Sequence, residues 1–414
     1  MVTFESLSMH YFIIFTYKAS YFMLQFPHRI HNKKVVLLAL FVLFLLSGCK
    51  DPTEGKPIEI SDSKVANITY AKGFSIEKSS SGITIIKVTS PWPNANKVYT
   101  YALIPRNKLA SITLNINEYD AIVTVPITKL VATSTTHVPA LESLGVIHTL
   151  VGFPGTDYIS SKETRKRIGA GFIKELGNNE SINTEMAIAI QPDVVVGFGI
   201  DNQNAIYETI QNANIPVVYN GDWTEETPLG KAEWIKFFAP FFQLEKKADS
   251  IFKGIEASYL EAKTLAQNAE TKPTVLSGAM FKDVWYVPGG KSWASQFLID
   301  ANSTYLWKDT KETGSLSLSI ETVLNIGQRA EYWVSPSQYT SYDALVKDNQ
   351  HYGQFDAYKN KKIYTFAKTV GETGGLLYYE LGPNRPDLVL KDLIHILHPE
   401  ILPNHQLFFF TPLE

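Results

Sequence analysis

The chain has 414 residues, of which 45% are hydrophobic and 19% are charged, so it is long enough for two domains and can bury a core. This composition excludes a disordered, collagen-like or coiled-coil chain. A net charge of −3 lacks the basic excess of a nucleic-acid-binding protein, and we expect no nucleic-acid partner. With a single cysteine, Cys49, the chain can form neither an internal disulfide nor a thiolate zinc cluster.

The N-terminal region is typical of an export signal. Two lysines precede an unbroken apolar run at residues 35–46, which ends in small residues before Cys49. The run is shorter than the ~20 residues that span a bilayer as a helix, so we predict a signal peptide over residues 1–48. Residues 46–49 resemble a lipobox, whose cysteine is lipidated. Met23 would begin a signal of ordinary length, so either the start lies too early or the basic region is unusually long; we favour the first.

The polar segment at residues 49–64 is typical of a flexible tether. We therefore expect a membrane-attached protein of the cell envelope. A lipid on Cys49 would hold the folded part on the periplasmic or extracytoplasmic side.

The next part of the chain, residues 65–227, has the pattern of an α/β lobe. It begins with strand-like stretches at 83–86 and 99–103. Short apolar strands then alternate with helices, which indicates a parallel sheet with helices on its faces. Strands are expected at 130–132, 150–152, 194–196 and 217–219, and helices at 138–144, 184–190 and 205–213.

A helical stretch follows at residues 228–267, where six apolar or small residues recur at helical spacing between 248 and 262. Strand and helix then alternate again through a second α/β lobe, residues 268–414. Strands are expected at 275–276, 285–287, 332–334 and 363–365, and helices at 293–300, 320–326 and 386–397. The predicted fold is α/β, with two lobes of mainly parallel sheet joined by one long backbone helix and a cleft between them. A rigid helix between lobes permits only small hinge motions.

Five motifs in order resemble the substrate-binding lipoproteins of bacterial ABC importers for iron–siderophores, haem and cobalamin. The likeness runs from about residue 121 to 402. The motifs are residues 129–145 with Leu-Val-Ala-Thr-Ser-Thr-Thr-His, 191–196 with Gln-Pro-Asp-Val-Val-Val, 228–235 with Pro-Leu-Gly, 285–290 with Trp-Tyr-Val-Pro-Gly-Gly, and 385–399 with Arg-Pro-Asp.

The resemblance implies capture of a chelated metal or macrocycle and its delivery to an ABC permease and its ATPase, by a protein that is a monomer. In this family one glutamate on each lobe docks on arginines of the permease, and the matching positions are Glu185 and Glu321. Carboxylates near helix N-termini can form bidentate pairs with arginine. The helix dipole also favours acidic residues in any first turn, which leaves a purely structural alternative open.

A run of polar side chains between a predicted strand and helix is one candidate ligand site. Ser134, Thr135, Thr136 and His137 offer hydroxyl and backbone N–H groups to an anionic ligand. Plain N-capping is the alternative. One histidine cannot hold a bare ion, so we expect no metal ligated by the protein and no resident cofactor. A chelated metal needs no protein ligands.

Aromatic and arginine side chains complete the candidate site. The resemblance places five aromatic residues in or near the cleft, and two arginines could pair with ligand oxygens. They are Trp285, Tyr286, Trp293, Tyr378, Tyr379, Arg165 and Arg385. Core packing is the alternative for the aromatic residues, and an ion pair with Asp387 or the other lobe is the alternative for Arg385. A cluster of basic residues is missing, which disfavours a strongly anionic siderophore.

Enzyme motifs fail in this sequence. Gly289-Gly-Lys-Ser292 ends like a phosphate-binding loop, but Trp285 stands where the first glycine is required. Gly197-Phe-Gly199 lacks the third glycine of a dinucleotide fingerprint, because Asn202 stands there. We therefore predict a binding protein for an iron–siderophore rather than an enzyme. Cobalamin or haem binding is the alternative within the class, and an envelope hydrolase or a lipoprotein with another partner are the alternatives outside it.

Overall fold

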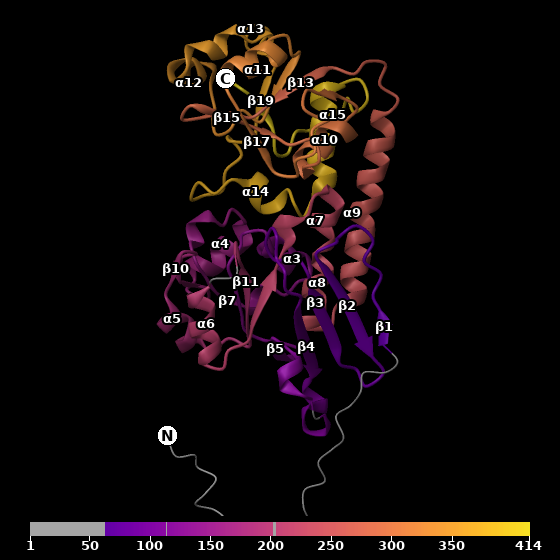
Figure 1. The fold of residues 1–414 in the computed structure, drawn as a ribbon, viewed down its shortest axis with the longest axis vertical. Coiled ribbons are helices and arrows are strands. Elements are labelled where there is room, and N and C mark those ends of the chain that lie inside the picture. Colours follow the sequence, from indigo (N-terminus) through magenta and orange to yellow (C-terminus); the bar gives the residue numbers. More distant parts are fainter. Residues whose placement is uncertain (1–62, 113, 202–203) are drawn as a thin grey trace, which may run out of the picture. The chain divides into compact units, whose positions relative to one another are not determined.

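The computed structural model describes residues 63–112, 114–201 and 204–414 (Figure 1). The predicted signal peptide, Cys49 and nearly all of the predicted tether lie outside the described residues. In the described part of the chain, no helix is long and apolar enough to cross a membrane.

A five-stranded sheet opens the described chain. Its strands pair in chain order, antiparallel except for the parallel last pair. They are β1 (Ser63–Val65), β2 (Phe74–Ser79), β3 (Thr84–Val88), β4 (Tyr99–Pro105) and β5 (Ala121–Val125). Two acidic side chains, one before α7 (Pro228–Glu233) and one at its end, hold the segment that precedes β2. Buried Glu233 accepts the backbone N–H groups of Thr69, Tyr70 and Ala71, and Glu225 accepts those of the next two residues.

A parallel sheet forms the rest of the N-terminal lobe, in the order β12-β11-β6-β7-β8. Its strands are β6 (Leu130–Ala132), β7 (Leu150–Phe153), β8 (Lys174–Glu175), β11 (Val194–Phe198) and β12 (Val217–Asn220). The helices between them are α3 (His137–Ser143), α4 (Lys162–Gly169), α5 (Thr184–Ile190) and α6 (Ala205–Asn212). A two-stranded ribbon of β9 (Gly177–Asn178) and β10 (Ser181–Ile182) precedes α5.

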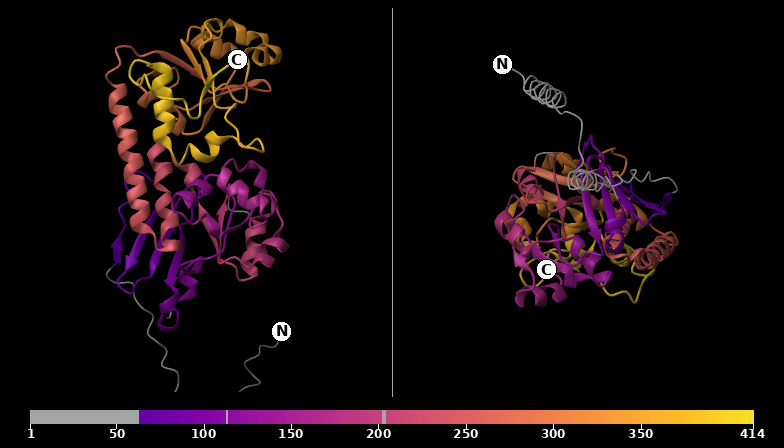
Figure 2. Two further views of the ribbon diagram at one scale, coloured as in Figure 1. Left: turned by 180° about the vertical axis from the view of Figure 1, so that it is seen from behind. Right: turned by 90° about the horizontal axis from the view of Figure 1, so that it is seen from below.

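Three helices, rather than one, connect the lobes. They are α7 (Pro228–Glu233), α8 (Ile235–Phe242) and α9 (Glu245–Ala266). The break before α9 has a local cause, because Gln243 takes a left-handed conformation (φ 59°) that ends α8. Seen from behind, α9 runs alongside both lobes (Figure 2).

The C-terminal lobe contains a second, mainly parallel sheet in the order β16-β13-β18-β19-β20, with only β20 antiparallel. Its strands are β13 (Thr274–Ser277), β16 (Thr304–Tyr305), β18 (Tyr332–Val334), β19 (Ile363–Thr365) and β20 (Thr411–Pro412). An antiparallel sheet of β14 (Ala279–Phe281), β15 (Val284–Pro288) and β17 (Ser315–Leu318) lies beside it. The main helices are α10 (Trp293–Asp300), α11 (Ile320–Gly327), α12 (Tyr342–Asp348), α13 (Asp356–Lys359), α14 (Leu377–Leu381) and α15 (Pro386–Leu397).

The helix α9 belongs to the cores of both lobes. Ala248 and Phe252 in its first half pack in the N-terminal core, and Tyr259, Ala262 and Ala266 in its second half pack in the C-terminal core. The predicted class, α/β with two lobes around a shared long helix, is confirmed. The mainly antiparallel opening sheet is an addition to the predicted parallel pattern.

Candidate functional site

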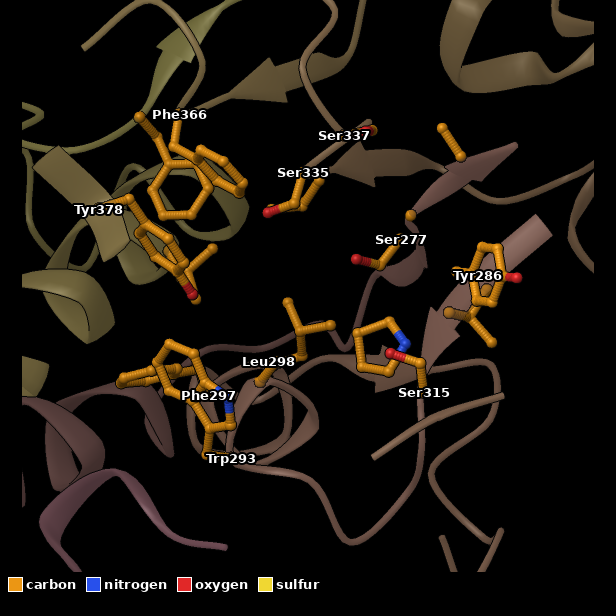
Figure 3. A pocket seen from close by; sticks show the side chains of 18 of the residues that line it. Ser277, Tyr286, Trp293, Phe297, Leu298, Ser315, Ser335, Ser337, Phe366 and Tyr378 are labelled. Atoms are coloured by element: carbon orange, nitrogen blue, oxygen red, sulfur yellow. The ribbon is translucent and has the colours of Figure 1, made fainter. Parts of the chain in front are cut away.

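A pocket opens in the C-terminal lobe at the carboxyl ends of its parallel strands (Figure 3). Ser277 is the last residue of β13, and Ser335 and Phe366 directly follow β18 and β19. The pocket encloses about 320 Å³. Carboxyl ends of parallel strands are where α/β sheets bind ligands, because the loops that follow them diverge there. We call this space the C-lobe pocket.

Aromatic rings form one wall of the C-lobe pocket. The ring of Phe366 stacks on that of Tyr378 with centroids 4.5 Å apart and planes 7° apart. Tyr378 also stacks on Trp293, with centroids 5.8 Å and planes 24° apart. Trp293 is the first residue of α10 and Tyr378 lies in α14, so two helices and a strand end build this wall. Because these rings stack on one another, they offer their edges and the outer faces of the stack to an apolar ligand.

Serine side chains supply the polar groups of the same pocket. Ser277 and Ser335 are directed into the space in Figure 3. Ser335 and Ser337 have left-handed backbone conformations, with φ of 59° and 52°. Non-glycine residues in this region are strained, and such strain gathers at functional sites. No charged side chain of the described residues lines the C-lobe pocket, so its recognition groups are aromatic faces and hydroxyls.

A second space, the cleft pocket, lies between the lobes and encloses about 590 Å³. The N-terminal lobe contributes Thr135 and Tyr158, and the C-terminal lobe contributes Gln338 and the segment around Leu376. Tyr379 lines both the cleft pocket and the C-lobe pocket. The two spaces are therefore adjacent, with Tyr379 at their boundary.

Two strand ends of the N-terminal lobe, those of β11 and β12, are covered instead. The Trp92 ring, 6% exposed, packs edge-on against Tyr219 at 5.2 Å, on the strand β12. The same segment accepts a hydrogen bond from Trp223 Nε1 at the carbonyl of Pro91 (3.1 Å). Thr133 directly follows β6, and its hydroxyl forms hydrogen bonds with the Tyr207 hydroxyl and with the Phe198 backbone N–H, so it is not free to bind a ligand. The loop between β3 and β4 thus covers the edge where a ligand would otherwise lie.

The predicted hydroxyl run 134–137 has a smaller role than expected. Ser134 Oγ and Thr136 Oγ1 hydrogen-bond each other at 2.8 Å, and α3 begins without a side-chain cap. The Thr136 carbonyl accepts a hydrogen bond from Asn384 of the other lobe (2.8 Å). Of this run, Thr135 alone lines a described pocket.

His137 lies in the core and does not face a ligand, contrary to expectation. It is 1% exposed, and its ring centroid lies 5.3 Å from that of Phe238 in α8. Burial lowers its pKa, although Asp222 and the Asn220 amide oppose this, so the ring is neutral near pH 7.

Four of the five predicted aromatic residues come together at the C-lobe pocket: Tyr286, Trp293, Tyr378 and Tyr379. Trp285 does not. It is fully buried, stacks on Trp333 with centroids 5.3 Å apart, and donates its Nε1 hydrogen to the Ser277 carbonyl. The reason is the strand period of β15, which turns alternate side chains to opposite faces and brings Tyr286 to the pocket instead.

The two predicted arginines lie outside both pockets. Arg385 forms a bidentate pair with Asp387 (2.8 and 2.9 Å), which raises the pKa of Arg385 and engages its guanidinium within its own lobe. Arg165 donates to the Thr156 carbonyl at 2.6 Å and lies on α4 near the lobe junction. These contacts match the structural alternative for Arg385.

The two predicted docking glutamates are exposed, one on each lobe. Glu185 lies in the first turn of α5, capped by Asn183, and Glu321 lies in the first turn of α11, capped by Ser319. Hydrogen bonds from its own backbone N–H and from Ser319 hold the pKa of Glu321 below its usual value. Both carboxylates are thus available to a partner.

Sequence reasoning missed Ser277, Ser335 and Phe366, although each directly follows a strand that the pattern predicts. The rule that ligands bind beyond the carboxyl ends of parallel strands would have selected them. Across residues 63–112, 114–201 and 204–414, no group of three or more His, Cys, Asp or Glu side chains is arranged to hold a metal ion.

Comparisons with known proteins give one family. The sequence profile of a family described as periplasmic binding protein matches residues 130–369. An uncharacterized lipoprotein of Methanocaldococcus jannaschii is 28% identical over 298 residues, which are 70% of this chain and 69% of the relative.

Solved structures show a similar fold. A possible iron-binding (periplasmic solute-binding) protein from Staphylococcus epidermidis superposes with a TM-score of 0.52 at 18% identity, covering 66% of this chain and 99% of that one. A periplasmic heme binding protein from Pseudomonas aeruginosa gives 0.51 at 17% identity, covering 66% and 93%. At such identities the likeness shows the fold alone.

Proposed function

The chain belongs to the periplasmic binding protein family, and from that premise we propose that it captures a metal chelate and delivers it to the permease of an ABC importer. The observation that carries this proposal is the C-lobe pocket, where stacked aromatic rings and strained serines lie at the carboxyl ends of parallel strands. Such an arrangement binds and orients a ligand but holds no group that is poised for covalent chemistry. The ligand is therefore released unchanged.

The charge of the pocket selects among chelates. An uncompensated anion would lose hydration in a pocket without cationic side chains, and this loss disfavours binding. Three hydroxamate groups neutralise Fe(III), whereas three catecholates leave an excess of negative charge. We propose a neutral ferric siderophore, of the hydroxamate kind, as the ligand.

A planar macrocycle, haem or cobalamin, is the second candidate. The stack of Phe366, Tyr378 and Trp293 supports it, because a planar ligand could extend such a stack at one of its ends. The Pseudomonas aeruginosa protein with the similar fold is a heme binding protein.

Each lobe has its own part in the proposed mechanism. The C-terminal lobe holds the ligand through Trp293, Tyr378 and Tyr286, and the N-terminal lobe closes the cleft pocket through Tyr158 and Thr135. Because α9 packs in both cores, closure is a small hinge movement.

Delivery needs a surface that the permease recognises. We propose that Glu185 and Glu321 form bidentate pairs with permease arginines, one on each lobe, and that a lipid on Cys49 keeps the protein at the membrane outside the cytoplasm. Docking at both lobes at once would let the permease pull the cleft open.

A thermal-shift panel tests the ligand. The probes are a ferric trihydroxamate, a ferric tricatecholate, haem and cobalamin, with recovery of each compound checked by mass spectrometry. A ligand at 100 times its Kd stabilises the folded state by about 2.7 kcal/mol, so the trihydroxamate should raise Tm and be recovered intact. No shift with any probe, or a consumed probe, contradicts the proposal. In a second arm, Glu185→Lys with Glu321→Lys should abolish uptake while leaving the thermal shift unchanged.

A further inference from the structure

A strap of the C-terminal lobe, residues 367–385, is fastened to the N-terminal lobe. It includes α14 and makes hydrogen bonds from its start to its end. Thr373 Oγ1 donates to the Asp157 carbonyl at 2.7 Å, and Asn384 Nδ2 donates to that of Thr136 at 2.8 Å. Between these contacts lies a buried carboxylate, Glu380.

Glu380 is the acidic contact of the strap. It is 2% exposed, and its two oxygens accept the backbone N–H groups of Ser160 (2.5 Å) and Ser161 (2.9 Å). These residues immediately precede α4, so the two N–H groups favour the charged carboxylate, whereas its burial opposes the charge. We propose that Glu380 is a positioning residue that docks α14 on the N-terminal lobe, and that this docking takes up a proton.

A second carboxylate lies at the same contact. Glu142 of α3 accepts hydrogen bonds from Ser161 Oγ and from Thr164 Oγ1 (2.6 Å), so Ser161 contacts both acids. In the described part of the chain, neither Glu380 nor Glu142 forms an ion pair. A buried carboxylate with a second carboxylate beside it and no cation paired to it favours retention of a proton on the buried one, Glu380.

The pKa of Glu380 agrees with this geometry. Its pKa is raised from 4.5 to about 7, chiefly by burial and also by the charge of Glu142, while the hydrogen bonds from Ser160 and Ser161 act in the opposite direction. When α14 leaves α4, the carboxylate returns to water and its pKa falls toward the ordinary value.

Other charged groups border the junction without neutralising Glu380. On α3, His137 is neutral and buried. On α4, Arg165 is engaged by the Thr156 carbonyl and lies 3.9 Å from Asp157. Together with Lys162, Lys166 and Glu372 of the strap, it lines a third pocket of about 830 Å³. After α14, Arg385 is paired with Asp387.

The direction of the pH effect follows from linkage. The docked arrangement binds the proton more tightly, so docking is strongest below pH 4.5 and weakens until the pH passes about 7. Between pH 6 and pH 8 the docking constant should fall about tenfold, because the docked carboxyl changes from mostly protonated to mostly charged.

The consequence for the site comes through α14 itself. Tyr378 and Tyr379 precede Glu380 in this helix and line the C-lobe pocket, so docking sets the aromatic wall and the boundary with the cleft pocket. This consequence rests on the proposed function, but the docking equilibrium exists without any ligand.

Hydrogen–deuterium exchange of the full chain in detergent micelles, with no ligand, tests the proposal. Peptides that span residues 156–161 and 376–385 are followed at pH 6 and pH 8, with correction for intrinsic exchange. In the native protein, protection should fall about tenfold at pH 8. Glu380→Gln never ionises but keeps an acceptor oxygen for only one of the two backbone N–H groups, so its protection should be lower than that of the native protein at pH 6 and should no longer depend on pH. Glu142→Gln removes the neighbouring charge, so the fall should shrink.

The matched control is Glu372→Gln, an exposed acid on the same strap, which should behave like the native protein. Exchange protection that does not depend on pH in the native protein would overturn the proposed proton uptake. The same holds if Glu380→Gln loses as much protection between pH 6 and pH 8 as the native protein does. Since no ligand is present, either result leaves the proposed ligand class to the thermal-shift panel.

Discussion

The two lobes use the same alternation of strand and helix, yet they treat the carboxyl ends of their strands differently. In the C-terminal lobe, β13, β18 and β19 end at an open pocket of aromatic rings and serines. In the N-terminal lobe, the ends of β11 and β12 are covered by Trp92 and its neighbours.

The covering segment belongs to the opening part of the chain, which precedes the family match at residues 130–369. This segment packs so closely that two glycines opposite it have no room for a side chain. A Cβ atom added to Gly199 would lie 3.0 Å from the Trp92 ring, and one added to Gly221 would lie 2.5 Å from the Ser90 carbonyl oxygen. The comparison teaches that the loop between β3 and β4 can cover two strand ends in one lobe while the matching strand ends of the other lobe stay open.

The largest expected effect comes from removing this cover. Trp92→Ala should destabilise the protein by about 3 to 5 kcal/mol, because it leaves a cavity among Tyr99, Tyr219 and the strand ends. Chemical denaturation measures the change in the free energy of unfolding. The control is Phe281→Ala, an exposed aromatic residue at the rim of the C-lobe pocket, which should cost less than about 0.5 kcal/mol. Equal costs would contradict the contrast between closed and open strand ends.

A smaller effect is expected from an aromatic residue of the open site. The ligand for this test is the chelate that raises Tm in the thermal-shift panel. Trp293→Ala should lower the affinity for it about thirtyfold, because buried aromatic contacts contribute about 2 kcal/mol or more. Calorimetric titration measures it. Trp223→Ala removes the same side chain from the closed lobe, where it bonds the Pro91 carbonyl, and should leave affinity unchanged. Equal losses would show that both lobes contact the ligand.

The smallest effect concerns the strained serine. Ser335→Gly removes the strain of a left-handed backbone, which costs the folded state about 1 to 2 kcal/mol. Glycine also raises the conformational entropy of the unfolded chain, which costs about 0.5 to 1 kcal/mol of stability. We therefore expect a net stabilisation of about 0.5 kcal/mol. Losing one hydroxyl should weaken ligand binding about three- to tenfold. Ser277→Ala loses a hydroxyl without relieving strain and should lower affinity only. A destabilised Ser335→Gly would remove the argument for strain at the site. Thermal unfolding and titration separate the outcomes.

Several helices could be predicted to the residue because their start signals are local. The helices 184–190, 293–300 and 386–397 have the observed bounds, with Asn183 and Ser292 as capping residues and Pro386 at a first position. Helix α4 was missed because its sequence is almost wholly polar and buries Thr164 alone, so it has no apolar stripe. The break between α8 and α9 was missed because the apolar pattern continues through it.

The site was predictable only in part. The aromatic residues of the C-lobe pocket follow from motifs near strand ends. Which of Trp285 and Tyr286 faces the pocket depends on the alternation of side chains along β15, and the register of β15 against its neighbours sets that alternation. The covering role of Trp92 and the contact of Glu380 with Ser160 join residues far apart in the chain, with separations of 127 and 220. No local pattern carries such contacts.

Helix α9 has a thermodynamic consequence for the whole folded part. Its first half is covered by the N-terminal core and its second half by the C-terminal core, so melting either lobe strips apolar surface from a helix that the other lobe needs. Short helical segments are marginal in water without packing partners. The lobes are therefore coupled as one cooperative unit, and heating should produce a single endotherm rather than two.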